Sequence, residues 1–275
     1  MTARRVMLAV VACGLMYAGV ATAQLTSAQQ SCIDNYNNKL RLVSQQAGKS
    51  ATECIKNAAG GSETDPEGCV VGNPDGKIAA KEAKVADLFG PGAKCDPVPP
   101  VIVRAPAIGN AAHRSAITRM MHELFGNPIG PVSTAKMDAK CLAKAVQRAT
   151  QAYVEIIKQQ RSCKKAGLKG GTITNNATLT SACGTFALID AGGKAAGKLT
   201  KLDADVQSAC AQPGIDLAVL FDGLAPACQG SATALSGCLQ AHARCRACYA
   251  LVYADGPTMN CDTFDDGLAN LSCAS

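Results

Sequence analysis

The sequence contains no tryptophan, and its 275 residues include only five tyrosines, five phenylalanines and three histidines. With aromatic side chains at 4% of the chain, an enzyme built around a bulky core and a deep aromatic pocket is not expected. The apolar 48% of the chain is instead dominated by 49 alanines, and such small side chains bury little area each. Charged residues at 17% argue against a disordered chain. The composition therefore predicts a folded protein with a thin core.

Sequence signatures of nucleophilic catalysis are also missing. No Gly-x-Ser-x-Gly motif occurs, and His113 and His122 lie nine residues apart on one expected helix, a spacing that puts them on different faces. Gly60 and Gly170 each begin a glycine pair that follows an expected helix, where glycine ends the helix rather than cradling a phosphate. We therefore assign no catalytic residue and expect a protein that is not an enzyme.

The first 23 residues have the layout of a secretory signal peptide. Arg4 and Arg5 supply positive charge, residues 6–20 are uncharged and mostly apolar, and Ala21-Thr22-Ala23 gives a small-residue cleavage pattern. An alternative is lipoprotein processing, in which Cys13 would carry the lipid. No later stretch is long and apolar enough to span a bilayer, so we expect no transmembrane segment in the mature chain.

Cysteine is the residue that the chain has in excess. Removal of residues 1–23 takes Cys13 away and leaves 14 of the 15 cysteines, an even number that fits seven disulfides. Disulfides persist in oxidising compartments, so we expect an exported protein of the periplasm or the extracellular space. The same cleavage lowers the formal charge from +6 to +4, a weak basic balance that gives no case for a nucleic-acid partner. We expect the partner to be a protein, a glycan or a surface.

The cysteine positions repeat along the chain. Cys32 and Cys54 are 22 residues apart, as are Cys141 and Cys163, and each cysteine of the second set lies 109 to 115 residues after its counterpart. The segments 75–81 and 190–196 resemble each other, although the second has extra glycines. This pattern indicates tandem duplication. We therefore expect four parts: signal peptide 1–23, repeat unit 24–132, repeat unit 133–237, and a partial repeat or cap at 238–275.

Each unit is expected to be a helical hairpin closed by disulfides. Apolar residues recur at helical spacing over 141–163 and, more weakly, over 32–54, and no stretch alternates with period two, so the fold class is all-α. An antiparallel hairpin brings its outer ends together and its inner ends together. This topology predicts the disulfides Cys32–Cys95, Cys54–Cys69, Cys141–Cys210 and Cys163–Cys183. Six cysteines have no assigned partner: Cys228, Cys238, Cys245, Cys248, Cys261 and Cys273.

Three further helices are expected over residues 76–89, 112–125 and 188–206, where apolar residues fall three and four apart. Residues 96–109 contain four prolines and are expected to be extended. Residues 127–133 are expected to form the junction between the two units.

The cysteine spacing, the segment 75–81 and the ending 260–273 together resemble a group of uncharacterised secreted cysteine-rich tandem-repeat proteins of environmental bacteria. The resemblance covers most of the mature chain. It implies an exported repeat protein, and it carries no activity or catalytic residue to this chain.

The Cys245-Arg246-Ala247-Cys248 segment raises two chemical alternatives. Cys245 and Cys248 could form a redox-active dithiol, which needs two neighbouring thiols of which one has a lowered pKa. His242 with the same two cysteines could contribute to a zinc site, although zinc needs a fourth ligand. No βαβ context accompanies the CxxC, so structural disulfides are the favoured interpretation.

Aspartates gather in the stretch 255–266 and suggest calcium as a second candidate ion. The candidate ligands are Asp255, Asp262, Asp265 and Asp266. The simpler interpretation is a turn with helix-capping aspartates, and no other cofactor is expected. We therefore predict a non-catalytic structural or binding module, with the redox dithiol and the calcium module as alternatives.

Overall fold

The computed structural model describes residues 25–99, 103–268 and 273. The predicted signal peptide, with Cys13 and its cleavage pattern, lies outside these residues. Within them the fold is all-α, without any strand. Longer helices build the body: α1 (Ser27–Ala59), α3 (Lys77–Ala86), α4 (Pro106–Phe125), α5 (Lys136–Lys169), α8 (Lys194–Cys210) and α11 (Ala232–Asp255). Helices of eight residues or fewer lie between or after them: α2 (Pro66–Gly72), α6 (Asn176–Cys183), α7 (Phe186–Ile189), α9 (Leu217–Leu220), α10 (Pro226–Gln229) and α12 (Cys261–Asp265).

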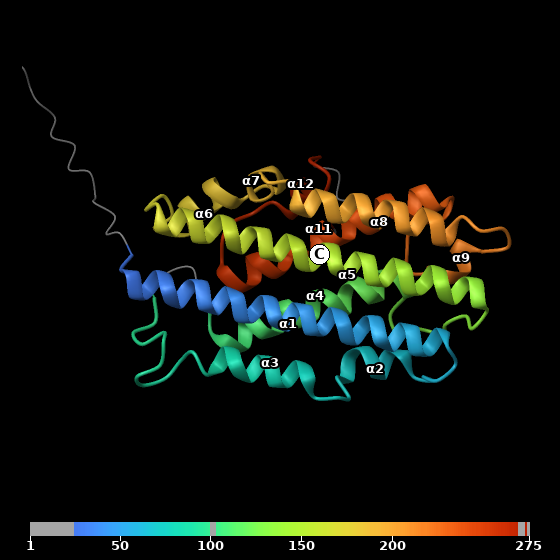
Figure 1. The fold of residues 1–275 in the computed structure, drawn as a ribbon, viewed down its shortest axis with the longest axis horizontal. Coiled ribbons are helices and arrows are strands. Elements are labelled where there is room, and N and C mark those ends of the chain that lie inside the picture. Colours follow the sequence, from blue (N-terminus) through green and yellow to red (C-terminus); the bar gives the residue numbers. More distant parts are fainter. Residues whose placement is uncertain (1–24, 100–102, 269–272, 274–275) are drawn as a thin grey trace, which may run out of the picture.

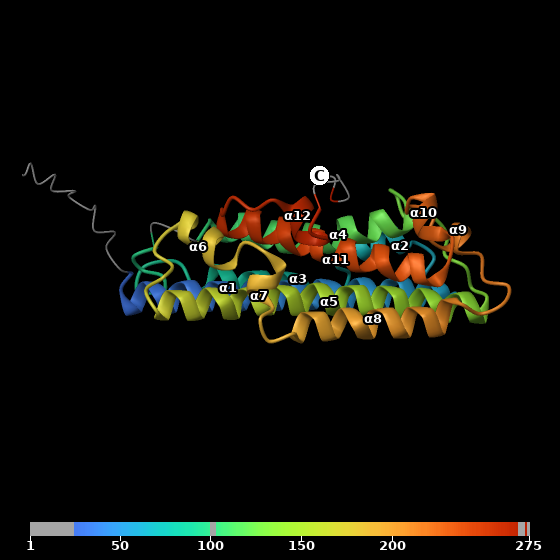
Figure 2. The ribbon, with the colours of Figure 1, turned by 90° about the horizontal axis from the view of Figure 1, so that it is seen from above.

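The helices form two layers (Figures 1 and 2). α3, α1, α5 and α8 lie side by side in one layer, with α1 and α5 at its centre. α4 and α11 lie side by side in the second layer and pack across α1 and α5 from one side. The other side of the α1–α5 pair, which faces the viewer in Figure 1, has no second layer over it.

The two central helices extend further than the periodicity predicts. α1 has 33 residues and α5 has 34, so each is about 50 Å long. Thr26 and Gln29 form a capping box that begins α1, and Gly60 and Gly170 end the two helices. The long helices supply continuous surfaces against which the remaining, shorter elements pack.

Disulfides fix the ends of both hairpins. The structure bonds Cys32 to Cys95, Cys54 to Cys69, Cys141 to Cys210 and Cys163 to Cys183, which are the pairs that the hairpin topology predicts. In each half, one disulfide joins a short helix (α2 or α6) to the C-terminal part of the long helix. The other disulfide, Cys32–Cys95 or Cys141–Cys210, joins cysteines 63 or 69 residues apart. Such cross-links restrict the unfolded chain and so add to the stability of the folded protein.

The return helices of the two hairpins start in the same way. Gly76 (φ 64°) and Gly193 (φ 66°) precede α3 and α8 in the left-handed conformation, which glycine adopts without steric cost. Asp190 accepts hydrogen bonds from the first backbone N–H groups of α8, at 2.8 Å and 2.7 Å. The helix expected over 188–206 therefore begins later than predicted, because Gly193 and Asp190 form its N-terminus.

Two other predictions need correction. The extended segment expected over 96–109 ends earlier, because Pro106 takes the first position of α4, where its missing N–H would have no partner in any case. The boundary expected between residues 237 and 238 lies inside α11, which packs against α4, α5 and α8. In chain order, α11 follows the second hairpin as α4 follows the first.

Candidate functional site

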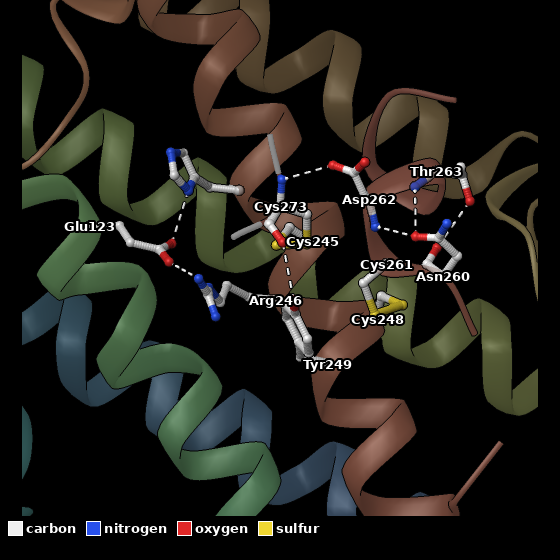
Figure 3. The surroundings of a disulfide bond; sticks show 11 residues. Glu123, Cys245, Arg246, Cys248, Tyr249, Asn260, Cys261, Asp262, Thr263 and Cys273 are labelled. Carbon is white, nitrogen blue, oxygen red and sulfur yellow. Dashed lines mark hydrogen bonds and ion pairs between the residues drawn. A yellow bond between two sulfur atoms is a disulfide. The ribbon is translucent and has the colours of Figure 1, made fainter. Parts of the chain in front are cut away.

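The six cysteines without predicted partners form three further disulfides. Cys228 is bonded to Cys238, which closes the loop before α11. Cys245 and Cys273 form the second bond, and Cys248 and Cys261 form the third. The last two disulfides join α11 to α12 and to Cys273, and they hold these parts of the chain against α11 (Figure 3).

This pairing corrects the redox alternative. The two cysteines of the CxxC segment are bonded to Cys273 and Cys261 rather than to each other. All fourteen cysteines of the described residues are bonded, so no thiolate is present there to act as a nucleophile or a zinc ligand. His242 has a different partner, because its Nδ1 lies 2.9 Å from a carboxylate oxygen of Glu123.

The acidic stretch does not gather into a calcium site. Asp255 is fully buried and forms an ion pair with Lys164. Asp262 accepts a hydrogen bond from the Cys273 N–H at 3.3 Å, and Asp266 accepts one from the Leu268 N–H at 2.7 Å. Asp265 is buried, and residues 25–99, 103–268 and 273 contain no group of three carboxylate, histidine or cysteine side chains that could hold a metal ion.

An open groove of about 390 Å³ lies between α4 and α11 on the outer side of the second layer. Ile108 and Tyr253 line one end and are about half exposed, at 47% and 51%. Arg119 and Tyr249 line it further along the two antiparallel helices. Its floor consists of small side chains: Ala112, Ala116 and Ala250. Because alanines let the two helices approach closely, the longer side chains on either side stand up as walls.

The tyrosine wall is held in place from both sides. Tyr249 donates a hydrogen bond to the carbonyl oxygen of Cys273 at 3.1 Å, and its ring stacks on Tyr253 with centroids 6.2 Å apart. The Arg246 guanidinium carbon lies 5.3 Å from the centroid of the Tyr249 ring. Cys245 and Cys248 precede Tyr249 on the same helix, so two disulfides anchor this stretch of the groove wall (Figure 3).

Glu123 joins the two groove helices at their far end. Its carboxylate on α4 binds Arg246 on α11 (Figure 3). The same carboxylate binds His242 on α11. Burial opposes ionisation of Glu123, but the hydrogen bonds and charges of His242 and Arg246 outweigh it and hold the pKa of this carboxyl below its ordinary range. The arrangement keeps a charged cross-link between α4 and α11, and it leaves Arg119 as the exposed cation of the groove.

The sequence interpretation missed this groove. Tyr249 and Tyr253 are four residues apart and therefore share a helix face, which was a usable signal. Ile108 lies in the segment expected to be extended, so its place beside Tyr253 was hidden.

Comparison with known proteins finds no match among protein-family models, curated proteins or solved structures. Within the described part of the chain, no helix combines the length and apolar character needed to cross a membrane.

Proposed function

We propose that the protein is an exported binding module without catalytic activity, and that the α4–α11 groove binds a protein partner. The expected ligand is an apolar side chain that lies next to an aspartate or glutamate in the partner's sequence. The carrying observation is the exposed pair of Ile108 and Tyr253 above an alanine floor, with Arg119 on the same groove.

The groove has the chemistry of a protein-recognition site. Tyrosine and arginine supply a large share of the binding energy in protein interfaces, because they combine apolar area with a polar or charged end. A volume of about 390 Å³ accommodates one or two side chains, and Arg119 offers a charge complementary to a carboxylate. Tyr249 is already held by Cys273 and Arg246, and Tyr253 stacks on Tyr249, so binding would cost little ordering of this wall.

Export and duplication belong to the same proposal. Seven disulfides are typical of a protein in an oxidising compartment, which supports a location in the periplasm or outside the cell. The two halves share a long helix, a short helix, a return helix and a covering helix in that order, and this supports an origin by duplication. Membership of the secreted cysteine-rich repeat proteins stays a prediction.

The test is selection of peptides from a random library displayed on phage, with the disulfide-bonded protein as the target. Enriched peptides should carry an apolar or aromatic residue next to an acidic one. Ala111 is exposed and lines the groove, so Ala111→Trp should fill the groove and abolish binding without disturbing the core. Ala107→Trp is the matched control, because Ala107 is exposed on the same helix outside the groove.

The outcome is decisive in both directions. Loss of binding in Ala111→Trp and Arg119→Ala, with retention in Ala107→Trp, supports the proposal. Peptides without a shared pattern, or binding that all three variants retain, would show that the groove is not the protein-binding site.

A further inference from the structure

A second groove, of about 610 Å³, runs along the uncovered side of the α1–α5 pair. The lining residues belong to α1, α5 and α8, on the side away from α4 and α11. This side of the α1–α5 pair faces the viewer in Figure 1. Its floor includes Gly48 on α1 and Thr150 on α5. Gly48 faces Thr150, and a Cβ at position 48 would lie 3.1 Å from the Thr150 Cβ. Small side chains therefore let the helices approach, and longer polar side chains form the walls.

The walls carry hydrogen-bonding groups and no aromatic ring. Their amides and hydroxyls come from both central helices: Gln45, Thr52, Asn57, Gln147 and Gln151. The Thr52 and Thr150 hydroxyls lie 3.3 Å apart, and Thr52 also donates to the Gly48 carbonyl at 2.7 Å. This lining suits a ligand rich in hydroxyl groups, and without aromatic rings it offers no surface on which nucleic-acid bases or neutral sugar rings could stack.

Three lysines give the groove its charge. Lys49 and Lys56 on α1 and Lys198 on α8 line the groove and are exposed. Among the described residues, no carboxylate lies within ion-pair distance of these three ammonium groups. By contrast, Lys158 and Lys165 on α5 form ion pairs, Lys158 with Glu155 at 3.2 Å and Lys165 with Asp34 at 3.1 Å. The groove lysines are therefore available to an anionic ligand.

Lys49 and Lys56 lie two helical turns apart, which is about 10 Å along α1. This is a low density of positive charge. It suits a chain with one carboxylate on each sugar better than a densely sulfated glycan or a nucleic acid, whose charges follow one another closely. Arginine, the usual partner of phosphate, does not line the groove.

Two glutamates also line the groove, Glu53 on α1 and Glu155 on α5. Glu155 accepts hydrogen bonds from Lys158 at 3.2 Å and from Gln159 at 2.5 Å. Glu53 is exposed, so its charge opposes the binding of an anionic ligand.

We propose that the α1–α5 groove binds a carboxylated polysaccharide, with Lys49, Lys56 and Lys198 meeting the uronate carboxylates and the amide-rich walls meeting the sugar hydroxyls. This site is independent of the α4–α11 groove, because it lies on the opposite face.

The experiment measures binding of alginate oligosaccharides to the disulfide-bonded protein by isothermal titration at low ionic strength. The triple variant Lys49→Gln/Lys56→Gln/Lys198→Gln should bind about tenfold more weakly or worse. The matched control is Lys84→Gln/Lys94→Gln/Lys169→Gln, which removes three exposed lysines outside the groove and should leave the affinity unchanged. Glu53→Gln should strengthen binding, because it removes a negative charge from the groove.

Heparin, neutral dextran and single-stranded DNA serve as competing probes. The proposal expects alginate to bind more tightly than all three. It is overturned if alginate does not bind, if heparin or DNA binds more tightly, or if the control triple loses as much affinity as the groove triple. Circular dichroism of each variant verifies that a loss of binding does not arise from unfolding.

Discussion

The two sides of the α1–α5 pair differ in how they use polar residues. On the inner side, which α4 and α11 cover, Ser44 hydrogen-bonds His113 at 2.7 Å and Tyr153 at 3.1 Å, and all three side chains are buried. On the outer side, exposed Lys49 and half-buried Gln151 have no covering layer. The same helix pair thus has internally satisfied polar groups on one side and groups available to a ligand on the other.

The ion pairs show the same difference. Lys164 and Asp255 are buried inside the molecule, where Lys164 also donates to Asn37 at 2.8 Å. Burial lowers the pKa of Lys164 and raises the pKa of Asp255, and their mutual attraction works against both shifts. At the edge of the pair, Asp34 binds Arg161 and Lys165 with partial exposure to solvent. The inner pair should therefore respond strongly to mutation, and the outer pair weakly.

The largest expected effect comes from breaking the inner pair. Asp255→Ala leaves the Lys164 ammonium buried without its counter-charge, and we expect it to lower the free energy of unfolding by about 3–5 kcal/mol. Urea unfolding monitored by circular dichroism measures the change. The double variant Lys164→Met/Asp255→Leu should regain most of the loss, since both charges are then absent. A double variant as unstable as Asp255→Ala would contradict this account.

A smaller effect should appear as a dependence on pH. Burial and the nearby Lys164 charge lower the pKa of His113 from 6.5 to about 3. The unfolded chain takes up this proton near pH 6.5, and the folded protein does not, so the stabilisation is complete above pH 6.5 and is lost as the pH falls toward 3.

The slope should approach about 1.4 kcal/mol per pH unit below pH 6.5. Urea unfolding of the wild type and of His113→Gln between about pH 7.5 and 5 separates this contribution from those of other groups, because the variant lacks this slope. Identical pH dependence in the two proteins would exclude His113 as its source.

The smallest effect is expected at the outer pair. Asp34→Asn removes the partner of both Arg161 and Lys165, and we expect a loss of about 1 kcal/mol or less, because the pair is partly solvated. The loss should shrink further in 1 M salt, where screening acts within about 3 Å. Thermal unfolding at low and high salt measures it. A loss as large as that of Asp255→Ala would remove the distinction between the two sides.

The sequence predicted the helical frame better than the surfaces that α4 and α11 create. Cysteine spacing and hairpin topology were enough to pair Cys32 with Cys95, because neighbouring helix ends must meet. The spacing of Cys238, Cys245 and Cys248 fits one side of a helix, but the full extent of α11 was not predicted. Alanines and cysteines lie on several faces of this helix, so its apolar residues show no clear periodicity. Asp255 was a candidate calcium ligand, but its partner Lys164 lies 91 residues away in the sequence and only the fold brings the two together.

The grooves could not be predicted for the same reason. Ile108 on α4 and Tyr253 on α11 line one groove, and Lys56 on α1 and Gln147 on α5 line the other. Each pair is far apart in the sequence, and their residue types are common on solvated helices. Only the packing of the helices distinguishes these residues from others of the same type.

Each of the seven disulfides joins cysteines of the same half, either before residue 126 or after residue 135. A protease that cut the connection between α4 and α5 would therefore release two fragments with complete sets of cross-links. Non-covalent contacts would then hold the fragments together: packing across α1–α5 and α4–α11, and polar contacts such as Lys164 with Asn37, Arg161 with Asp34 and Arg246 with Glu123. The two halves could accordingly be produced as separate chains that oxidise independently and then recombine, as in fragment complementation.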